Sequence, residues 1–349
     1  MKDCLVKAWQ FLFGELFTLK HLCATLQQRP QRFAESEDRK PTFQLPFVRN
    51  VINCISITFA SVSLSIASLN SGSNGNCYYI GNANEGVLID AGISCRETAR
   101  RLKHLGLSIK MVKAIFITHE HADHINGLPK LIKKYYLPVY MTAGTRSNLK
   151  SRWGEIRSIT LQAYEPVTIG GLTITGFPKF HDAVEPHSFM VSHNNINVGV
   201  FTDTGISCEH LIKNFQQCHA AFLESNYDEV MLETGGYSQH LKDRIRNGNG
   251  HLSNTEALQL FLNHRPPFMS HLILSHLSAN NNKPEIVEKL FRGAASETEI
   301  IIASRKKETA LYYINRLPNQ IQKILKPIRV NHKTQLSLFE EAHEPSLVS

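Results

Sequence analysis

Closely spaced cysteines and long apolar runs are what this sequence lacks. Its seven cysteines are scattered, and none of them forms a Cys-x-x-Cys pair. A disulfide framework and a structural zinc knuckle are therefore disfavoured, since both need paired cysteines. Unpaired cysteines are typical of a reducing compartment, so we expect a cytoplasmic protein.

The apolar stretches near the N-terminus do not favour a membrane span. The run 9–17 contains Glu15, is too short to cross a bilayer and precedes no clear small-residue cleavage site. Residues 51–69 are uncharged, but Asn and Ser interrupt them. From Ser63 to Leu69 apolar and small polar residues alternate, which favours a strand over a transmembrane helix. We expect no membrane partner.

The composition is that of a globular protein with a modest basic excess. Apolar residues make up 42% of the chain, which excludes a wholly disordered protein. The 38 Lys and Arg against 30 Asp and Glu leave a net charge of +8, which permits a polyanionic partner without establishing one. The 17 histidines are numerous enough to supply metal ligands, so their spacing needs examination.

Three parts of the chain differ in pattern. Residues 1–61 form an N-terminal extension, 62–316 form one large domain, and 317–349 form a polar tail punctuated by proline. In the domain, period-two and amphipathic patterns predict strands at 63–69, 77–80, 86–90, 111–118, 138–141, 172–177, 197–202, 221–224 and 271–275, and helices at 95–105, 128–136 and 255–264. In the first helix, Ala99, Leu102 and Leu105 are expected to share the buried face.

The strongest motif is the run of possible metal ligands from His119 to His124. His119, His121, Asp123 and His124 follow directly after a predicted strand. A strand would send alternate side chains to opposite faces, whereas a loop that leads into a helix can aim all four at one point. His and Asp suit zinc or another borderline divalent ion, and four donors are too many for one open catalytic site. The motif therefore predicts two adjacent ions, and the alternative is a polar turn that happens to be rich in histidine.

His-x-His-x-Asp-His after a strand resembles the hallmark of the metallo-β-lactamase superfamily, and the resemblance extends over about residues 64–316. It implies an α/β (α+β) fold, the four-layer αββα sandwich in which two mixed sheets lie face to face with helices outside. It also implies a hydrolase with two divalent ions, for which we expect zinc, with manganese as the alternative. The ions would lower the pKa of a shared water.

The resemblance also implies a role for each motif residue. Site one would be His119, His121 and His181, although His187 lies close enough in the sequence to compete with His181. Site two would be Asp123, His124 and His276, with Asp203 bridging both ions. Asp123 is also assigned to catalysis. Asp90, in Leu-Ile-Asp-Ala-Gly, would orient the ligand loop without binding metal.

The segment 250–257 resembles the Gly-His-Ser-Thr segment of RNase Z. This resemblance implies that His251 donates a proton or contacts the scissile phosphate. The alternative is an incidental histidine beside a helix cap formed by Ser253 or Asn254. Just upstream, Lys242, Arg244 and Arg246 are candidates for phosphate binding, although such a basic run is more often a solvated helix face.

A narrower resemblance is to the YycJ/WalJ group of bacterial cytoplasmic proteins, which are associated with nuclease activity on DNA. It rests on the segments 68–80, 226–228, 242–254 and 276–282. The group usually has Glu before its Asn pair, whereas this chain has Ala279 and Asn280 there. Group members begin near the equivalent of residue 62, so residues 1–61 are either a lineage extension or an artefact of start-site choice.

The tail contains Gln335-Leu-Ser-Leu-Phe, which resembles the pentapeptide that binds the bacterial sliding clamp. Gln335 would make polar contacts, while Leu336, Leu338 and Phe339 would supply the apolar ones. The alternative is that these apolar side chains pack back on the domain.

The resulting functional hypothesis is a dinuclear metal-dependent phosphodiesterase or nuclease, most consistent with a DNA exonuclease linked to replication or repair. DNA is favoured over RNA as the substrate. One alternative is a hydrolase of a small ester or thioester, and the other is a non-enzymatic clamp-associated protein that keeps its metal for structure.

Overall fold

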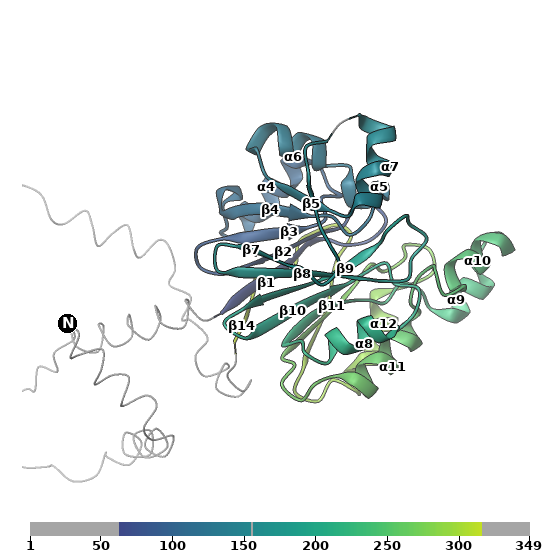
Figure 1. Cartoon of the computed structure of the whole chain (residues 1–349). Coiled ribbons are helices and arrows are strands. Elements are labelled where there is room, and N and C mark those ends of the chain that lie inside the picture. Colours follow the sequence, from purple (N-terminus) through teal and green to yellow (C-terminus); the bar gives the residue numbers. More distant parts are fainter. Residues whose placement is uncertain (1–62, 155, 316–349) are drawn as a thin grey trace, which may run out of the picture. The chain divides into compact units, whose positions relative to one another are not determined.

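Two seven-stranded sheets lie face to face in the computed structural model, which describes residues 63–154 and 156–315 (Figure 1). The first sheet has the order β14-β1-β2-β3-β4-β5-β6. Its strands from β3 to β6 are parallel, and the pairs β14–β1, β1–β2 and β2–β3 are antiparallel. The bounds are Leu64–Asn70 (β1), Cys77–Gly81 (β2), Gly86–Ile89 (β3), Val112–Phe116 (β4), Val139–Met141 (β5), Ile159–Thr160 (β6) and Tyr312–Ile314 (β14).

The second sheet has the order β13-β12-β11-β10-β9-β8-β7. It begins as an antiparallel meander from β7 to β10 and continues as parallel strands from β10 to β13. The bounds are Pro166–Ile169 (β7), Leu172–Pro178 (β8), His187–His193 (β9), Ile196–Phe201 (β10), Ala220–Glu224 (β11), His271–Ser275 (β12) and Glu299–Ile302 (β13).

Helices cover the outer face of each sheet. The first layer contains Cys95–His104 (α4), the 3-10 turn Ile109–Met111 (η1), Ala122–Ile125 (α5), Leu128–Tyr135 (α6) and Ala143–Trp153 (α7). The second contains Glu209–Phe215 (α8), Asn254–His264 (α11) and Pro284–Arg292 (α12), while Glu229–Thr234 (α9) and Gln239–Arg246 (α10) extend beyond the sheet edge (Figure 1). The predicted αββα sandwich is confirmed.

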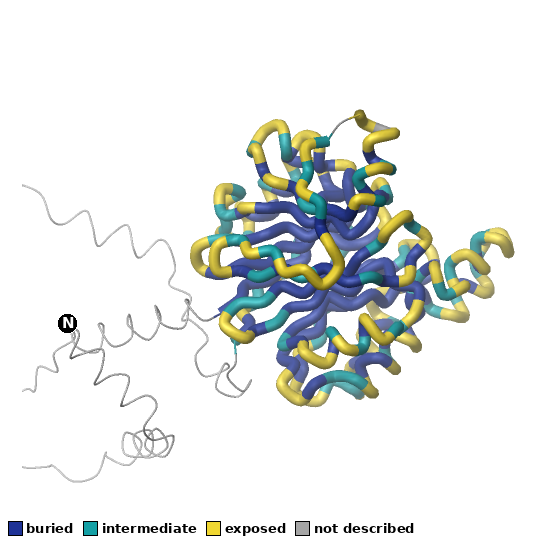
Figure 2. Tube along the Cα trace, viewed as in Figure 1, coloured by how far each residue is buried: buried dark blue, intermediate teal, exposed yellow. Residues whose placement is uncertain are grey.

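The inner strands β1, β2, β3, β11 and β12 are buried on both faces, because each sheet packs against the other sheet on one side and against helices on the other (Figure 2). Along β2, Tyr78 and Ile80 contribute to the core between the sheets. Cys77 and Tyr79 belong to the core between the first sheet and its helices. This alternation follows from the period of two along a strand.

The end of the uncharged segment 51–69 that the structure describes contains the buried strand β1. All seven residues of β1 are buried. Across residues 63–154 and 156–315, none of the helices has both the length and the hydropathy that a bilayer crossing needs. The predicted extension 1–61 and the tail 317–349, with Gln335, Leu336, Leu338 and Phe339, lie outside the described residues.

The buried face of α4 differs from the prediction. Leu102 is buried as expected, but Ala99 and Leu105 are only partly buried, and Arg101 is buried beside Leu102. The Arg101 guanidinium donates to the Leu69 carbonyl at 2.6 Å and to Asn70 Oδ1 at 2.7 Å. These partners satisfy a charged group that amphipathic periodicity alone places in solvent.

Replacing Phe222 with alanine is expected to destabilise the domain by about 3–5 kcal/mol, because the change leaves a cavity between the sheets. Phe222 is fully buried, and its ring centroid lies 4.9 Å from that of Tyr78. Urea unfolding measures the loss. The control is Tyr136→Ala, whose side chain is 87% exposed. Equal stability of the two variants would contradict the assignment of Phe222 to the core.

Candidate metal centre

The candidate ligands gather where neighbouring parallel strands end. Asp90 follows β3, and the motif from His119 to His124 follows β4, its parallel neighbour. In the second sheet, Asp203 follows β10, Glu224 ends β11 and His276 follows β12. Because the carboxyl ends of parallel strands meet at one edge, segments far apart in the sequence reach one place.

Three histidines form the first group of ring nitrogens. His119 Nε2 lies 3.0 Å from His121 Nδ1, and His181 Nε2 lies 3.3 Å from the same atom. His181 Nδ1 lies 2.9 Å from the Gly250 carbonyl, to which it can donate, and that bond leaves Nε2 to face the group. The structure therefore brings together the three residues expected at site one. His187, the competing candidate, instead faces the Glu185 carbonyl with Nδ1 at 3.1 Å.

The second group combines carboxylates and histidines. Asp203 Oδ2 lies 3.2 Å from His124 Nε2, and Asp203 Oδ1 lies 3.2 Å from His276 Nδ1. Asp123 Oδ2 lies 3.5 Å from both His124 Nε2 and His276 Nε2. Asp203 Oδ1 is also 3.8 Å from His181 Nε2, so this carboxylate lies between the two groups, where the predicted bridging ligand belongs.

Asp90 contacts the run from His119 to His124 and the residue before it, Thr118, which suits the role of orienting the ligand loop. Its Oδ1 accepts from the Thr118 backbone N–H at 2.9 Å, and its Oδ2 lies 2.7 Å from His124 Nδ1. The second contact turns His124 Nε2 towards Asp203. Gly92 completes the loop, because a Cβ there would lie 1.7 Å from the Asp123 carbonyl oxygen. The glycine of Asp-Ala-Gly is therefore required, because the two backbones approach too closely for a side chain at position 92.

Three residues at the centre have a left-handed backbone. The φ angles of Asp90, Asp203 and His276 are 63°, 54° and 56°. This conformation is costly for non-glycine residues and persists only where neighbours enforce it. At Asp203 the neighbours are fixed on both sides: Lys179 Nζ donates to the Thr202 carbonyl at 2.7 Å, and the Thr204 N–H donates to Glu224 Oε2 at 2.6 Å.

The charges of the two groups fit a pair of cations. Burial lowers the pKa of His181 to about 3, so its ring is neutral and ready to bind a metal. Burial also lowers the pKa of His276, but Asp203, Asp123 and Glu224 more than reverse the effect and raise it to about 10. The carboxylates of Asp203, Asp123 and Glu224 thus stabilise positive charge at this place. Asp203 Oδ2 and His276 Nε2 are buried without a hydrogen-bond partner, as expected for atoms that coordinate an ion.

Glu224 is a site residue that the sequence prediction missed. It is fully buried, and its Oε1 lies 2.8 Å from His251 Nδ1 and 3.0 Å from His276 Nδ1. Burial raises the pKa of Glu224, but the charge of His251 and hydrogen bonds from both histidines lower it to about 2. The sequence signal that could have identified Glu224 is an acidic residue at the end of an apolar strand. Asp203 and His276 occupy corresponding positions at the ends of their own strands.

Two asparagines also escaped the prediction. Asn76 Nδ2 donates to Asp123 Oδ2 at 3.1 Å, and Asn226 Nδ2 donates to the His276 carbonyl at 2.8 Å. Both side chains hold a candidate ligand in place. The motif segments 68–80 and 226–228 contain them, but residue type alone does not distinguish such a positioning role from a turn.

The three residues of the basic run have different surroundings. Lys242 is buried and donates to the Glu233 carbonyl, and Arg246 pairs with Glu233 and Asp243 on the surface. Arg244 alone of the three lines the cavity beside His251 and His276. Its Nε donates to Asp182 Oδ2 at 2.6 Å. The expectation of a basic run facing phosphate therefore needs correction for Lys242 and Arg246, because α10 turns them towards Glu233.

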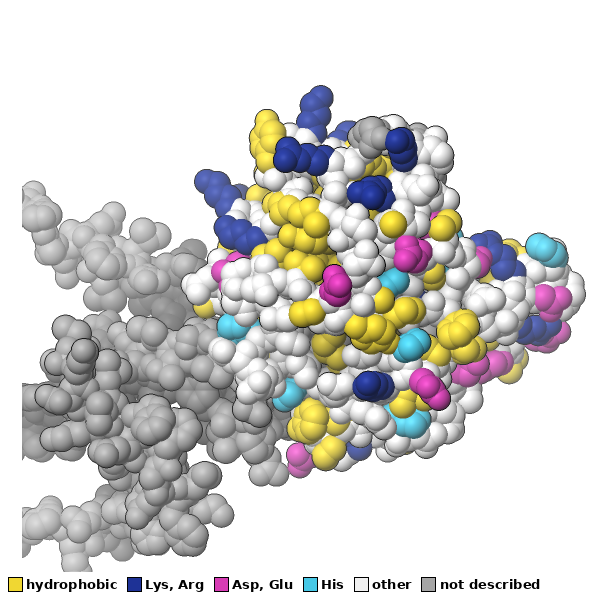
Figure 3. All heavy atoms as spheres, in the orientation of Figure 1, with side chains coloured by type: hydrophobic (Ala, Val, Ile, Leu, Met, Phe, Trp, Pro, Cys, Tyr) yellow, Lys and Arg dark blue, Asp and Glu magenta, His cyan; other side chains and the backbone are white. Residues whose placement is uncertain are grey.

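In the view of Figure 3, Lys and Arg lie mainly over the first helical layer at the top.

The helix cap that was considered as an alternative explanation of this segment is present: α11 begins at Asn254, directly after Ser253. Ser253 is the N-cap of α11 and forms a capping box with Glu256. The cap does not make His251 incidental, because His251 contacts Glu224 and lies 3.9 Å from Asp203 Oδ1.

Comparison with known proteins assigns the family. A family model described as a beta-lactamase superfamily domain matches residues 86–276. The exodeoxyribonuclease YycJ of Bacillus anthracis is 32% identical over 264 residues, which cover 72% of this chain and 100% of that protein. The chain belongs to the beta-lactamase superfamily. Within this superfamily it is a YycJ/WalJ-like protein, as predicted. The exodeoxyribonuclease WalJ of Streptococcus pneumoniae is 29% identical over 232 residues, covering 65% of this chain and 86% of that protein.

Solved structures show the same superfamily fold at low identity. The metallo-beta-lactamase fold protein YhfI of Bacillus subtilis has a TM-score of 0.56 and 18% identity, covering 72% of this chain and 99% of that one. Zn²⁺-bound PqqB of Methylobacterium extorquens has a TM-score of 0.53 and 13% identity, covering 70% and 99%. The fold and the clustered donors make this chain a metal-dependent hydrolase of the superfamily.

Lys179→Met is expected to destabilise the metal-free protein by about 3–5 kcal/mol, because it leaves buried carboxylates without their internal cation. Lys179 is buried, and the attraction of Asp203 and Asp90 opposes the lowering of its pKa by burial. Bound divalent ions would replace part of the missing charge, so excess zinc should restore part of the stability. Urea unfolding with chelator and with zinc measures both values.

The matched control is Lys133→Met, which changes an exposed lysine on α6. An equal loss for Lys179→Met with and without zinc would show that its charge does not balance the carboxylates.

Proposed function

We propose that this protein is a nuclease that uses two divalent ions to hydrolyse DNA phosphodiesters, and that it acts as an exonuclease. The observation that carries the proposal is the Glu224–His251 pair directly beside two adjacent donor groups. The relatives named exodeoxyribonuclease support DNA as the substrate. A link to replication or repair is part of the same proposal.

His119, His121 and His181 would hold one ion, and Asp123, His124 and His276 the other, with Asp203 shared. Zinc suits this set of nitrogen and carboxylate donors, and manganese is the alternative. Bound there, the ions supply Lewis acidity and lower the pKa of water, so that it can attack phosphorus at neutral pH. Asp123, which Asn76 orients, lies among the donors of the second group, so its assigned catalytic role would be exercised at that ion.

His251 would deliver the proton to the leaving oxygen. Glu224 accepts the Nδ1–H, which leaves Nε2 as the ring nitrogen that can serve the substrate. The ring lines the cavity that His276 also lines, so it reaches the same bound group as the second ion site. The leaving alkoxide needs this proton because it is a poor leaving group when charged.

Arg244 would contact the phosphate. Its side chain is 54% exposed and already pairs with a carboxylate of Asp182, whose shape and charge a phosphate imitates. Asp182 Oδ1 lies 3.3 Å from His181 Nε2, so the same carboxylate contacts both the Arg244 guanidinium and a residue of the candidate metal centre. A phosphate could therefore contact both.

The test is metal-supplemented digestion of end-labelled single- and double-stranded DNA and RNA by the full chain, with zinc and with manganese. We expect metal-dependent release of nucleotides from DNA and none from the Asp203→Ala or His124→Ala variant, because each change removes a ligand. Failure to cleave any nucleic acid would refute the proposal, and cleavage of small esters or thioesters alone would favour the other hydrolase class.

His251→Ala is expected to lower kcat on DNA by about 10²- to 10⁴-fold, as for loss of a general acid. Bound metal per protein, measured by elemental analysis, should not change, because the proposal uses His251 as a proton donor and assigns the ions to other residues, although His251 also lies within reach of a donor group with Asp203, Glu224 and His276. His240→Ala is the control, since His240 is exposed on α10. Loss of metal together with activity would instead assign His251 to the metal site.

We also propose that Gln335, Leu336, Leu338 and Phe339 bind a bacterial sliding clamp. The support is the motif in the sequence. A Leu338→Ala/Phe339→Ala protein should bind the clamp more weakly than the unchanged chain, as measured by surface plasmon resonance. Equal affinity would reject the proposal.

A further inference from the structure

A cavity of about 190 Å³ lies beside the metal centre, between α10 and the loops that carry His251 and His276. We call it the α10 pocket and define it by Tyr237, Leu241, Arg244, His251, His276 and Leu277. The proposed function uses three of these residues, His251, His276 and Arg244. The other three, Tyr237, Leu241 and Leu277, have no role in the hydrolysis itself; we call them the apolar lining.

The apolar lining consists of one aromatic and two aliphatic side chains. Tyr237 is half-buried, and Leu241 and Leu277 line the same space. Asn280 Nδ2 donates to the Tyr237 hydroxyl at 2.8 Å, which anchors the ring. Apolar side chains beside one fixed aromatic ring form a surface suited to a flat heterocycle.

The same cavity also has a positive charge in its lining. Arg244 is the one Lys or Arg among the described lining residues, and its guanidinium pairs with Asp182, which contacts His181. A nucleotide has the matching polarity, with a charged phosphate at one end and a flat base at the other. With its phosphate at Arg244 and the metal groups, the base would point towards Tyr237.

The size of the pocket selects one base. About 190 Å³ is below the roughly 300–1,000 Å³ of sites for drug-sized ligands. A space of this size suits a single base better than a hydrogen-bonded base pair, which favours an unpaired nucleotide.

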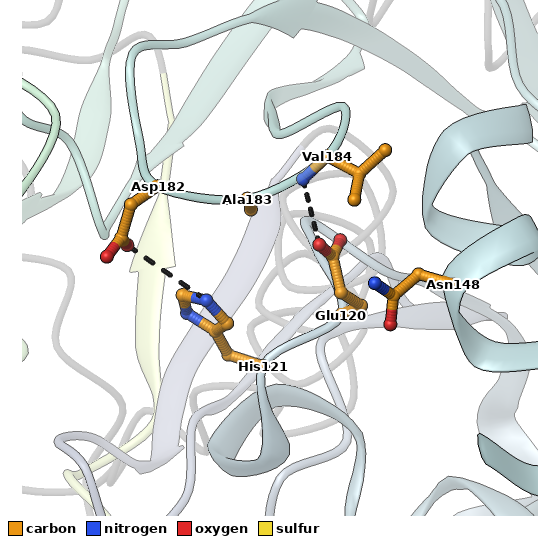
Figure 4. Close-up of a pocket in the computed structure, with 6 residues that line it drawn as sticks. All are labelled: Glu120, His121, Asn148, Asp182, Ala183 and Val184. Atoms are coloured by element: carbon orange, nitrogen blue, oxygen red, sulfur yellow. Dashed lines mark hydrogen bonds and ion pairs between the residues drawn. The ribbon is translucent and has the colours of Figure 1, made fainter. Parts of the chain in front are cut away.

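The neighbouring hollow does not offer the same chemistry. Glu120 and Asp182 line it together with Asn148 and Val184, and Figure 4 shows the Glu120 carboxylate facing the Val184 backbone N–H. Its described lining residues include two carboxylates and no Lys or Arg. Asp182 also lines the α10 pocket, but there Arg244, which pairs with it, lines the pocket as well. Because a cation attracts phosphate, the α10 pocket is the better of the two for the substrate strand.

We propose that the α10 pocket binds the base of one unpaired nucleotide next to the scissile phosphodiester, with Tyr237 as its stacking surface. The assignment rests on the proposed nuclease function and adds a residue that recognises the substrate without taking part in the chemistry. Tyr237 therefore affects substrate binding, and it does so only when a base is present.

The experiment compares two single-stranded DNA oligonucleotides, one complete and one with base-less tetrahydrofuran residues at the terminal positions of both ends. Tyr237→Ala should lower kcat/KM on the complete strand by roughly 5- to 100-fold, mainly through KM, because stacking on an aromatic ring is lost. On the base-less strand the variant and the unchanged protein should be equal. Tyr237→Phe keeps the ring and should retain most of the activity on the complete strand.

Tyr136→Ala, an exposed tyrosine on the distant first helical layer, is the matched control and should leave both rates unchanged. An equal loss on the complete and base-less strands, or no loss on either, would overturn the pocket assignment while leaving the nuclease function intact. Failure of the unchanged protein to cleave either strand would overturn the proposed function and the assignment together.

Discussion

The placement of Asp203 is the constraint on which the rest of the centre depends. This buried carboxylate must face both donor groups, and it can do so only from a left-handed backbone conformation. The residues on either side of it are fixed by charged side chains, Lys179 at the Thr202 carbonyl and Glu224 at the Thr204 N–H. The sheet supplies the geometry, because β10 and β11 run in parallel and end together.

Glu224 links this constraint to the chemistry. One oxygen holds the backbone after Asp203, and the other faces His251 and His276. A single buried carboxylate thus orients two candidate ligands, Asp203 and His276, and the proposed proton donor His251. Such shared support explains why a metal centre needs more than its ligands to be specific.

The superfamily fold leaves the substrate undetermined, because the sheets position only the metal centre. The surroundings that could discriminate substrates come from α9, α10 and the loops after β11 and β12. There Arg244 and Tyr237 line one cavity. The neighbouring hollow around Glu120 has no Lys or Arg among its described lining residues, so the two hollows differ in charge.

The sequence by itself determined the architecture and the local part of the site. Alternation in β1 and β2 and the run from His119 to His124 are local patterns, since their meaning depends on neighbours a few residues away. The candidate ligands His181, Asp203 and His276 were predicted through motifs of a known family, and the structure brings them together with the run from His119 to His124.

Tertiary structure alone decided which other charged residues matter. Glu224 and Lys179 act on Asp203 from segments that the chain brings together, and Arg101 is buried only because β1 offers it a carbonyl. Lys242, Arg244 and Arg246 are equivalent in the sequence, yet one helix directs them to three environments. The physical reason is that the effect of a buried charge is set by its partners, and those partners lie far away along the chain.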